Sequence, residues 1–255
     1  MRIGFLNRKR LYLPKFETAD NVKLISSLWA KGKNKEDFVQ ISTHLSDKSL
    51  APIHTEISHV SSDFLCASHT FKIDNIRKIF DGFSMNSFIR SHGYGELMRL
   101  ASLIHMKENG LVKNQIEALS SAIPFHYKYG FRPDFANCDL YNNMSVKFDD
   151  ESGESPFHTA KNALLYLSQN YGLLHSSKVQ CRNLLNNLVK NRNLDNKELK
   201  ILDSLMSDYL EKNIDNWDEK LMVDDIPMSL SMDRIEENAS FYNKLFEKHS
   251  IDYGV

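Results

Sequence analysis

The stretch that most constrains this chain is residues 87–110, which read SFIRSHGYGELMRLASLIHMKENG. Gly93 and Gly95 stand three and five positions after Arg90, directly before a segment whose apolar residues recur at helical spacing. The residues on that helix face are Leu97, Leu100, Ala101 and Ile104. The sequence therefore predicts a glycine turn that opens an amphipathic helix, with the apolar face of the helix packed on a sheet.

Such a turn is either an ordinary connection or an anion site. Backbone N–H groups can hold a diphosphate if they point into one concavity and no side chain blocks the approach. Gly93 and Gly95 meet the second condition, the helix start adds its positive dipole end, and Arg90 adds a cation. The stretch lacks the third glycine of the dinucleotide fingerprint and the Gly-Lys-Ser/Thr ending of a nucleotide P-loop, so neither of these two motifs is present.

The segments around this turn predict a mixed fold. Residues 54–60, 63–73 and 77–85 alternate as strands do, and KNQIEAL (113–119) is a strand candidate after the helix. Before them, Thr18 is predicted to cap a helix with Val22, Ile25, Leu28 and Trp29 on one face. Strand, turn, helix and strand in this order predict an α/β (α+β) class.

A change of character near residue 150 predicts two parts, 1–150 and 151–255. FDDESGESP (148–156) is acidic and poor in apolar residues, and the apolar residues after it recur at helical spacing. Two helices carry predicted capping boxes, Asp195 with Glu198 and Asp233 with Glu236. The second part is therefore predicted to be an all-α C-terminal region.

Composition narrows the classes of partner. Lys plus Arg is 32 and Asp plus Glu is 33, so the net charge of −1 predicts no general attraction to nucleic acid or anionic membrane. No run reaches the roughly 18 apolar residues of a membrane span, and the amino end lacks the apolar segment of a secretory signal, which predicts a cytoplasmic protein. The cysteines Cys66, Cys138 and Cys181 form no C-x-x-C pair, and the histidines lack metal-ligand spacing, so no metal is predicted.

Two motifs together resemble the GNAT superfamily of acyl-CoA-dependent N-acetyltransferases. The pyrophosphate loop of that superfamily reads R/Q-x-x-G-x-G/A, and this chain has Arg90-Ser-His-Gly93-Tyr-Gly95. About thirty residues on, the superfamily often has an alanine, aromatic residues and K-x-G-F, and this chain has AIPFHYKYGF at 122–131. The resemblance covers roughly residues 76–133.

The resemblance implies a mixed sheet that splays apart between the strand ending at Met85 and the strand near Gln115, with acetyl-CoA as cosubstrate lying in the opening. Arg90 would balance the pyrophosphate charge, and backbone near Met85 would donate to the thioester oxygen. The pyrophosphate would rest on the backbone N–H groups of Ser91, His92, Gly93, Tyr94, Gly95 and Glu96. Ser120 or Ser121 would replace an asparagine contact, because Leu119 stands where many members have asparagine.

The catalytic groups implied by the resemblance stay open. Many members protonate the leaving thiolate with a tyrosine four residues before the K-x-G-F glycine, a position that His126 occupies here, with Tyr127 one place further on. Either side chain, or water, could supply this proton. Asp81 and Glu117 are candidates for the base that takes the proton from the amine, and solvated or ion-paired carboxylates are the alternative.

The leading hypothesis is therefore an N-acetyltransferase that acts on a protein lysine, a protein amino terminus or a small amine. The alternative is a regulatory or interaction protein that binds acyl-CoA and has lost turnover, as the departures at Leu119 and His126 permit. The helical region is predicted to offer a surface for a protein partner. Abundant Asn and Lys suggest an AT-rich genome, and by association a bacterial effector delivered into a host cell.

Overall fold

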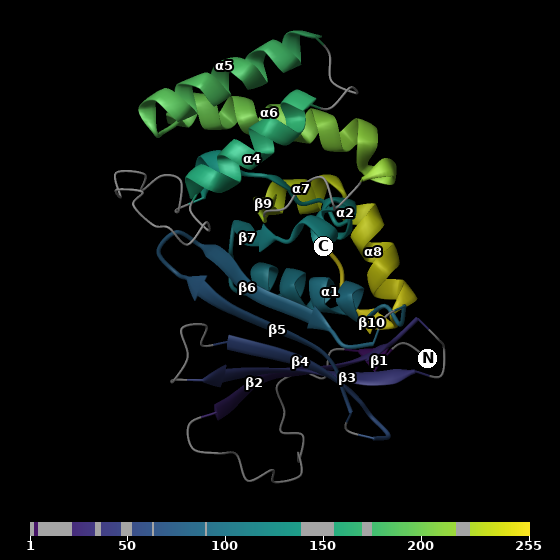
Figure 1. Cartoon of the computed structure of the whole chain (residues 1–255). Helices are drawn as coiled ribbons and strands as arrows, with labels where there is room; N and C mark the ends of the chain where they lie inside the picture. The colour runs from purple at the N-terminus through teal and green to yellow at the C-terminus, as the bar shows by residue number, and fades with distance from the viewer. Residues whose placement is uncertain are drawn as a thin grey trace. The chain divides into compact units, whose positions relative to one another are not determined.

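The computed structural model describes residues 3–4, 22–33, 37–46, 53–62, 64–89, 91–138, 156–169, 175–217 and 225–255 (Figure 1). The chain forms two compact units. Unit 1 combines Met1–Asn114 with Ser231–Val255, and unit 2 is Gln115–Leu230. The chain thus leaves unit 1 and later returns to it.

Unit 1 is built on an antiparallel sheet in which neighbouring strands follow chain order. The strands are β2 (Val22–Lys31), β3 (Phe38–Ser46), β4 (Ile53–His59), β5 (Leu65–Asp74) and β6 (Ile79–Ser87). In β4, Ile53, Thr55 and Ile57 are buried while the residues between them are more exposed, which is the alternation of a strand with one covered face. The predicted strands at 54–60, 63–73 and 77–85 are confirmed.

Helix α1 (Tyr94–Glu108) covers one face of this sheet, against β4, β5 and β6 (Figure 1). The predicted apolar face is confirmed, since all four of its residues are buried, and Phe71 and Phe80 stack in the same core with ring centroids 4.1 Å apart. Helices α7 (Met232–Glu237) and α8 (Ala239–Lys248) also belong to unit 1. The short strand β10 (Ile251–Asp252) pairs in parallel with β1 (Ile3–Gly4).

The predicted helix with Val22, Ile25, Leu28 and Trp29 on one face is wrong, because these residues lie in strand β2. The register of β2 against β3 shifts between Leu24 and Ser26. An extra residue at such a bulge breaks the two-residue alternation of a strand, and the apolar residues are then spaced as in a helix. Thr18 lies outside the described residues.

Unit 2 is mainly helical. Its helices are α2 (Ile123–Lys128), α4 (Pro156–Gln169), α5 (His175–Asn191) and α6 (Asn196–Asn213), with short 3₁₀ turns at Ser120–Ala122, Phe135–Asn137 and Ile214–Asn216. Strand β7 (Lys113–Ala118) enters unit 2 from unit 1, and β8 (Arg132–Pro133) pairs antiparallel with β9 (Ile226–Ser231). The Asp203 carboxylate accepts hydrogen bonds from the N–H groups of Phe135 (2.6 Å) and Ala136 (3.1 Å), which joins α6 to the 3₁₀ turn after β8.

The predicted class, α/β with a helical C-terminal part, is confirmed. Two strands, β9 and β10, interrupt the helical part, and both contain isoleucine, which favours strands. The capping box of Asp195 and Glu198 is present, whereas the box predicted for Asp233 and Glu236 is wrong: the Ser231 side chain caps α7. The predicted boundary at 148–156 lies outside the described residues except for Pro156, which begins α4.

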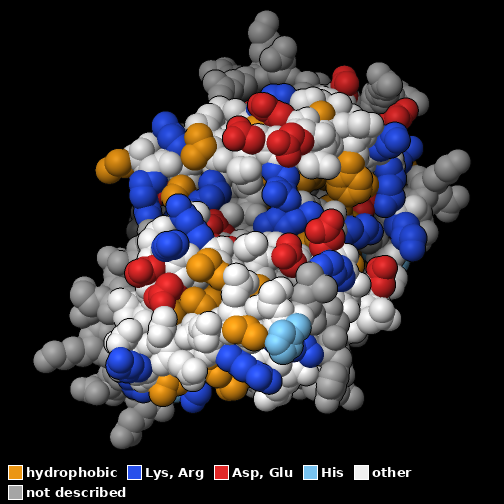
Figure 2. All heavy atoms as spheres, turned by 90° about the horizontal axis from the view of Figure 1, so that it is seen from above, with side chains coloured by type: hydrophobic (Ala, Val, Ile, Leu, Met, Phe, Trp, Pro, Cys, Tyr) orange, Lys and Arg blue, Asp and Glu red, His pale blue; other side chains and the backbone are white. Residues whose placement is uncertain are grey.

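The surface agrees with the nearly balanced charge of the sequence. On the face in Figure 2, Lys and Arg side chains are interspersed with Asp and Glu, and hydrophobic side chains form separate small spots. Among the described residues, no helix combines the length and apolar character needed to cross a bilayer.

Candidate functional site

A glycine turn opens helix α1, as the sequence predicts. Gly93 has φ 81° and Ser91 has φ 68°, both in the left-handed region, and α1 starts at the next residue, Tyr94. Leu97 N–H donates to the Gly93 carbonyl (3.0 Å) as the first bond of the helix. The N–H groups of residues 94–96 therefore precede the first intrahelical bond and have no acceptor within the helix. Arg90 lies outside the described residues.

The turn at Gly93 lies against His249 and against the connection between β2 and β3. A Cβ atom there would lie 3.4 Å from His249 Cε1 and 3.7 Å from Lys33 Cβ. The Lys33 N–H also donates to the His92 carbonyl (2.9 Å), so the connection between β2 and β3 is fastened to the turn. A Cβ at these distances would make ordinary contacts, so the positive φ, and not a lack of space, is what favours glycine at position 93.

We expect Gly93→Val to remove the rise in melting temperature that acetyl-CoA produces, because a β-branched residue is strained at positive φ and would reshape the turn. Gly110→Val is the matched control: Gly110 also has positive φ (59°), lies just beyond the other end of α1, and has open space where its Cβ would be. Thermal shifts of both variants with and without acetyl-CoA make the measurement. Equal loss in the two variants would attribute the effect to general strain.

Tyr94 is a buried anchor of the turn. Its hydroxyl donates to Asp37 Oδ2 (2.7 Å), and burial, followed by the Asp37 hydrogen bond, raises the pKa of the phenol far above its ordinary value. Asp37 also lies near His59 Nε2 (3.2 Å) and His92 Nδ1 (3.6 Å). Nothing local in the sequence indicates Asp37, because its contact with Tyr94 depends on the turn after β2 meeting the start of α1.

The Glu96 side chain is not exposed to solvent at the helix start. It is buried, and Oε1 lies 2.5 Å from both Lys248 Nζ and His249 Nε2. His249 Nδ1 in turn lies 2.5 Å from the carbonyl oxygen of Lys31, which can only accept. The last turn of α8 and the residue after it are therefore part of the surroundings of the glycine turn.

Met85 and Asp81 both lie on β6. Met85 is opposite His69 in the register of β5 and β6, and Asp81 is opposite Lys72, whose Nζ lies 3.2 Å from Asp81 Oδ2. Asp81 is therefore an ion-paired carboxylate on the sheet. Because Met85 belongs to unit 1 and Gln115 to unit 2, the predicted splay between them is not contained in either unit.

The second motif folds within unit 2. His126 is only 6% exposed, and its ring makes edge-to-face contacts with Phe125 and Phe131. Tyr127 is partly exposed, and the Arg132 guanidinium carbon lies 3.8 Å from the centre of its ring. Arg132 also donates to the Tyr127 carbonyl (3.1 Å), which fixes the pair.

The remaining predicted residues of this region lie on β7 and just after it. The side chain of Glu117 is exposed on β7. Ser120 begins the 3₁₀ turn, where its carbonyl accepts a hydrogen bond from Trp217 Nε1 (2.9 Å). Glu117, Ser120, His126 and Tyr127 belong to unit 2, whereas the glycine turn belongs to unit 1.

A buried polar network lies between α1 and the sheet. His105 Nε2 lies 2.9 Å from Thr43 Oγ1, which lies 2.9 Å from Thr55 Oγ1, and the second histidine, His69, has Nδ1 3.3 Å from Ser102 Oγ. Burial lowers the pKa of His105 from 6.5 to about 4 and also holds the pKa of His69 well below its ordinary value. Both imidazoles are neutral at pH 7, so this network packs the core.

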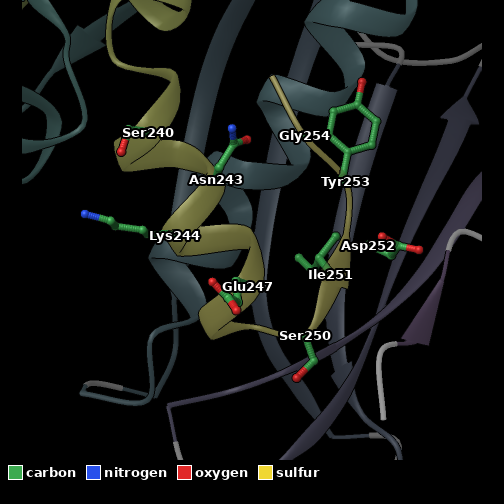
Figure 3. A pocket seen from close by; sticks show the side chains of 9 residues that line it. All are labelled: Ser240, Asn243, Lys244, Glu247, Ser250, Ile251, Asp252, Tyr253 and Gly254. Atoms are coloured by element: carbon green, nitrogen blue, oxygen red, sulfur yellow. The ribbon is translucent and has the colours of Figure 1, made fainter.

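A groove in unit 1 has a volume of about 730 Å³. Figure 3 shows its walls: one face of α8, with Ser240, Asn243, Lys244 and Glu247, and the segment from Ser250 to Gly254. None of the predicted site residues lines it, and its charged residues carry both signs. Within the described part of the chain, no group of three or more His, Cys, Asp or Glu residues is arranged to hold a metal ion.

No protein-family model matches the chain, and no curated protein matches it. Among solved structures it is similar to GCN5 of Tetrahymena, with 13% identity and a TM-score of 0.30, over 38% of this chain and 61% of that one. It is also similar to a nourseothricin acetyltransferase, with 14% identity and a TM-score of 0.30, over 47% of this chain and 79% of that one. The chain thus spans less than two thirds of the length of the Tetrahymena protein. Both structures are GNAT-type acetyltransferases, the superfamily that the two sequence motifs resemble, and at this identity and TM-score neither assigns an activity to the chain.

Proposed function

We propose that the chain is an N-acetyltransferase that moves the acetyl group of acetyl-CoA to an amine. The observation that carries the proposal is the left-handed glycine turn at the start of α1, in a sequence, RSHGYG, that fits the pyrophosphate loop of the GNAT superfamily. Positive φ at Ser91 and Gly93, followed by helix-start N–H groups that have no acceptor within the helix, suits the binding of a diphosphate by backbone.

The amine would attack the thioester carbon, lose a proton to a base, and expel CoA as a thiolate that takes a proton from an acid. Tyr127 is the residue proposed as this acid. Its ring is partly exposed and is positioned by Arg132, whose guanidinium carbon lies 3.8 Å from the ring centre. The base stays a prediction: Asp81 is paired with Lys72, and Glu117 is the exposed candidate.

The second candidate function is an acyl-CoA-binding protein without turnover. The observation that favours it is the burial of His126 between two aromatic rings, where many superfamily members have a catalytic tyrosine. A ring held in this way contributes to packing. Partner binding by the helical region and delivery into a host cell remain predictions from the sequence.

Acetyl-CoA is expected to stabilise the folded protein by mass action. At a concentration 100 times the Kd, the melting temperature should rise by about 5 to 10 °C for a protein of this size. Release of CoA thiol in the presence of lysine peptides, amino-terminal peptides and small amines then separates the two candidates. A thermal shift without thiol release from any amine supports the binding protein, and no shift at millimolar acetyl-CoA contradicts both.

A further inference from the structure

The start of α1 carries an acidic side chain where an anion is proposed to bind. Glu96 lies in the first turn of the helix, and its carboxylate is buried. A carboxylate at this place interacts favourably with the helix dipole, but it competes with any second anion and repels it. A diphosphate can therefore occupy the N–H groups of residues 94–96 only if another group balances the charge of Glu96.

The structure supplies such a group from the far end of the sequence. Lys248 Nζ lies 2.5 Å from Glu96 Oε1, and the Lys248 side chain is 46% exposed whereas that of Glu96 is 7% exposed. The two residues are 152 positions apart in the chain. The pair is thus a tertiary feature that no local motif encodes.

His249 fixes the carboxylate in this position. The imidazole is completely buried and joins the Glu96 carboxylate to the carbonyl of Lys31 at the end of β2. The backbone repeats this connection, since Lys31 N–H donates to the His249 carbonyl (2.9 Å). Glu96 is therefore held by one buried ring and one partly exposed cation.

We propose that Lys248 is a charge-balancing residue of the anion site at the start of α1, which neutralises Glu96 so that the diphosphate of an acyl-CoA can bind there, and that His249 is its positioning residue. The inference rests on the proposed function and adds to it two residues outside both sequence motifs. It also gives the C-terminal segment of unit 1 a role in ligand binding.

The test compares Lys248→Gln with Lys244→Gln. Lys244 is the matched control because it lies one turn earlier on α8, at the groove in Figure 3. Calorimetric titration with CoA at low salt should give a Kd about tenfold weaker for K248Q and unchanged for K244Q. The difference in Kd between K248Q and the wild type should shrink in about 0.5 M salt. Salt screens both the attraction of Lys248 for the diphosphate and the repulsion between Glu96 and the diphosphate. The melting temperature of ligand-free K248Q should stay near that of the wild type, because partly exposed ion pairs contribute little to stability.

A charge-rescue variant separates neutralisation from a merely structural effect. If Lys248 acts by neutralising Glu96, then E96Q/K248Q lacks both charges and should bind CoA within about threefold of the wild type. Failure of the double variant to recover binding, in a protein whose melting temperature shows that it is folded, overturns the proposal. The test uses K248Q and E96Q/K248Q alone, so it does not depend on whether a variant of the buried His249 folds.

The outcomes also separate this inference from the proposed function. If the wild type binds CoA and K248Q binds equally well, the inference is wrong and the proposed function stands. If the wild type binds neither CoA nor acetyl-CoA, the proposed function is wrong and the inference fails with it.

Discussion

The Tyr127→Phe variant is expected to transfer the acetyl group about 10²–10⁴-fold more slowly than the wild type, with little change in the Kd for acetyl-CoA. The reason is that phenylalanine keeps the ring under the Arg132 guanidinium but has no proton to give to the departing thiolate. The measurement is kcat against pH, with binding followed separately by calorimetry.

His126→Phe is the control for this prediction. If Tyr127 is the acid, turnover should survive in H126F, because an aromatic ring at position 126 can keep the edge-to-face contacts with Phe125 and Phe131. A loss of turnover in H126F, together with near-normal turnover in Y127F, would identify the histidine as the acid. Near-normal rates in both variants would leave the proton transfer to water.

The second large effect concerns stability in mild acid. The wild-type free energy of unfolding should fall by roughly 3 kcal/mol between pH 7 and pH 4, through His105 alone, with a further loss through His69. In the unfolded state, a histidine becomes protonated when the pH falls below its ordinary pKa of 6.5. In the folded state, burial lowers the pKa of His105 to about 4. Between these two values the unfolded state binds more protons, so stability decreases as the pH falls.

Urea unfolding at a series of pH values measures this loss, and His105→Phe tests its source. The hydroxyl of Thr43 keeps its partner Thr55 (2.9 Å) in that variant, so no polar group is left without a hydrogen bond. In H105F, the free energy of unfolding should change less steeply with pH over this range. The slope should correspond to about one proton fewer taken up on unfolding than in the wild type. An unchanged slope in H105F would mean that other groups, and not this histidine, cause the acid sensitivity.

Local patterns were sufficient to predict the elements in which the spacing of apolar or capping residues matches the burial and the caps in the structure. The apolar face of α1, the strands β4 to β6 and the capping box at Asp195 follow from spacing within a few residues. The turn at Gly93 could be predicted as well, because glycine is the residue that accepts its φ. Strand β2 was mistaken for a helix because its bulge disrupts the alternation on which the prediction depends.

The parts of the candidate site that could not be predicted depend on contacts between distant residues. Nothing near Glu96 in the sequence indicates that its partners are Lys248 and His249. Tyr94 was predicted for its backbone N–H, but its side chain is anchored to Asp37, 57 positions away. Periodicity identifies which residues of an element are buried, and it does not identify which element covers them.

The order in which unit 1 is assembled has a consequence for synthesis. Because Ser231–Val255 belongs to the same compact unit as Met1–Asn114, a nascent chain cannot complete this unit until Ser231–Val255 has also left the ribosome. The whole of Gln115–Leu230 is made before that moment, while the glycine turn still lacks Lys248 and His249. A chain that stops before residue 248 would therefore have every residue of both sequence motifs and still carry Glu96 without the two side chains that hold it in the finished protein.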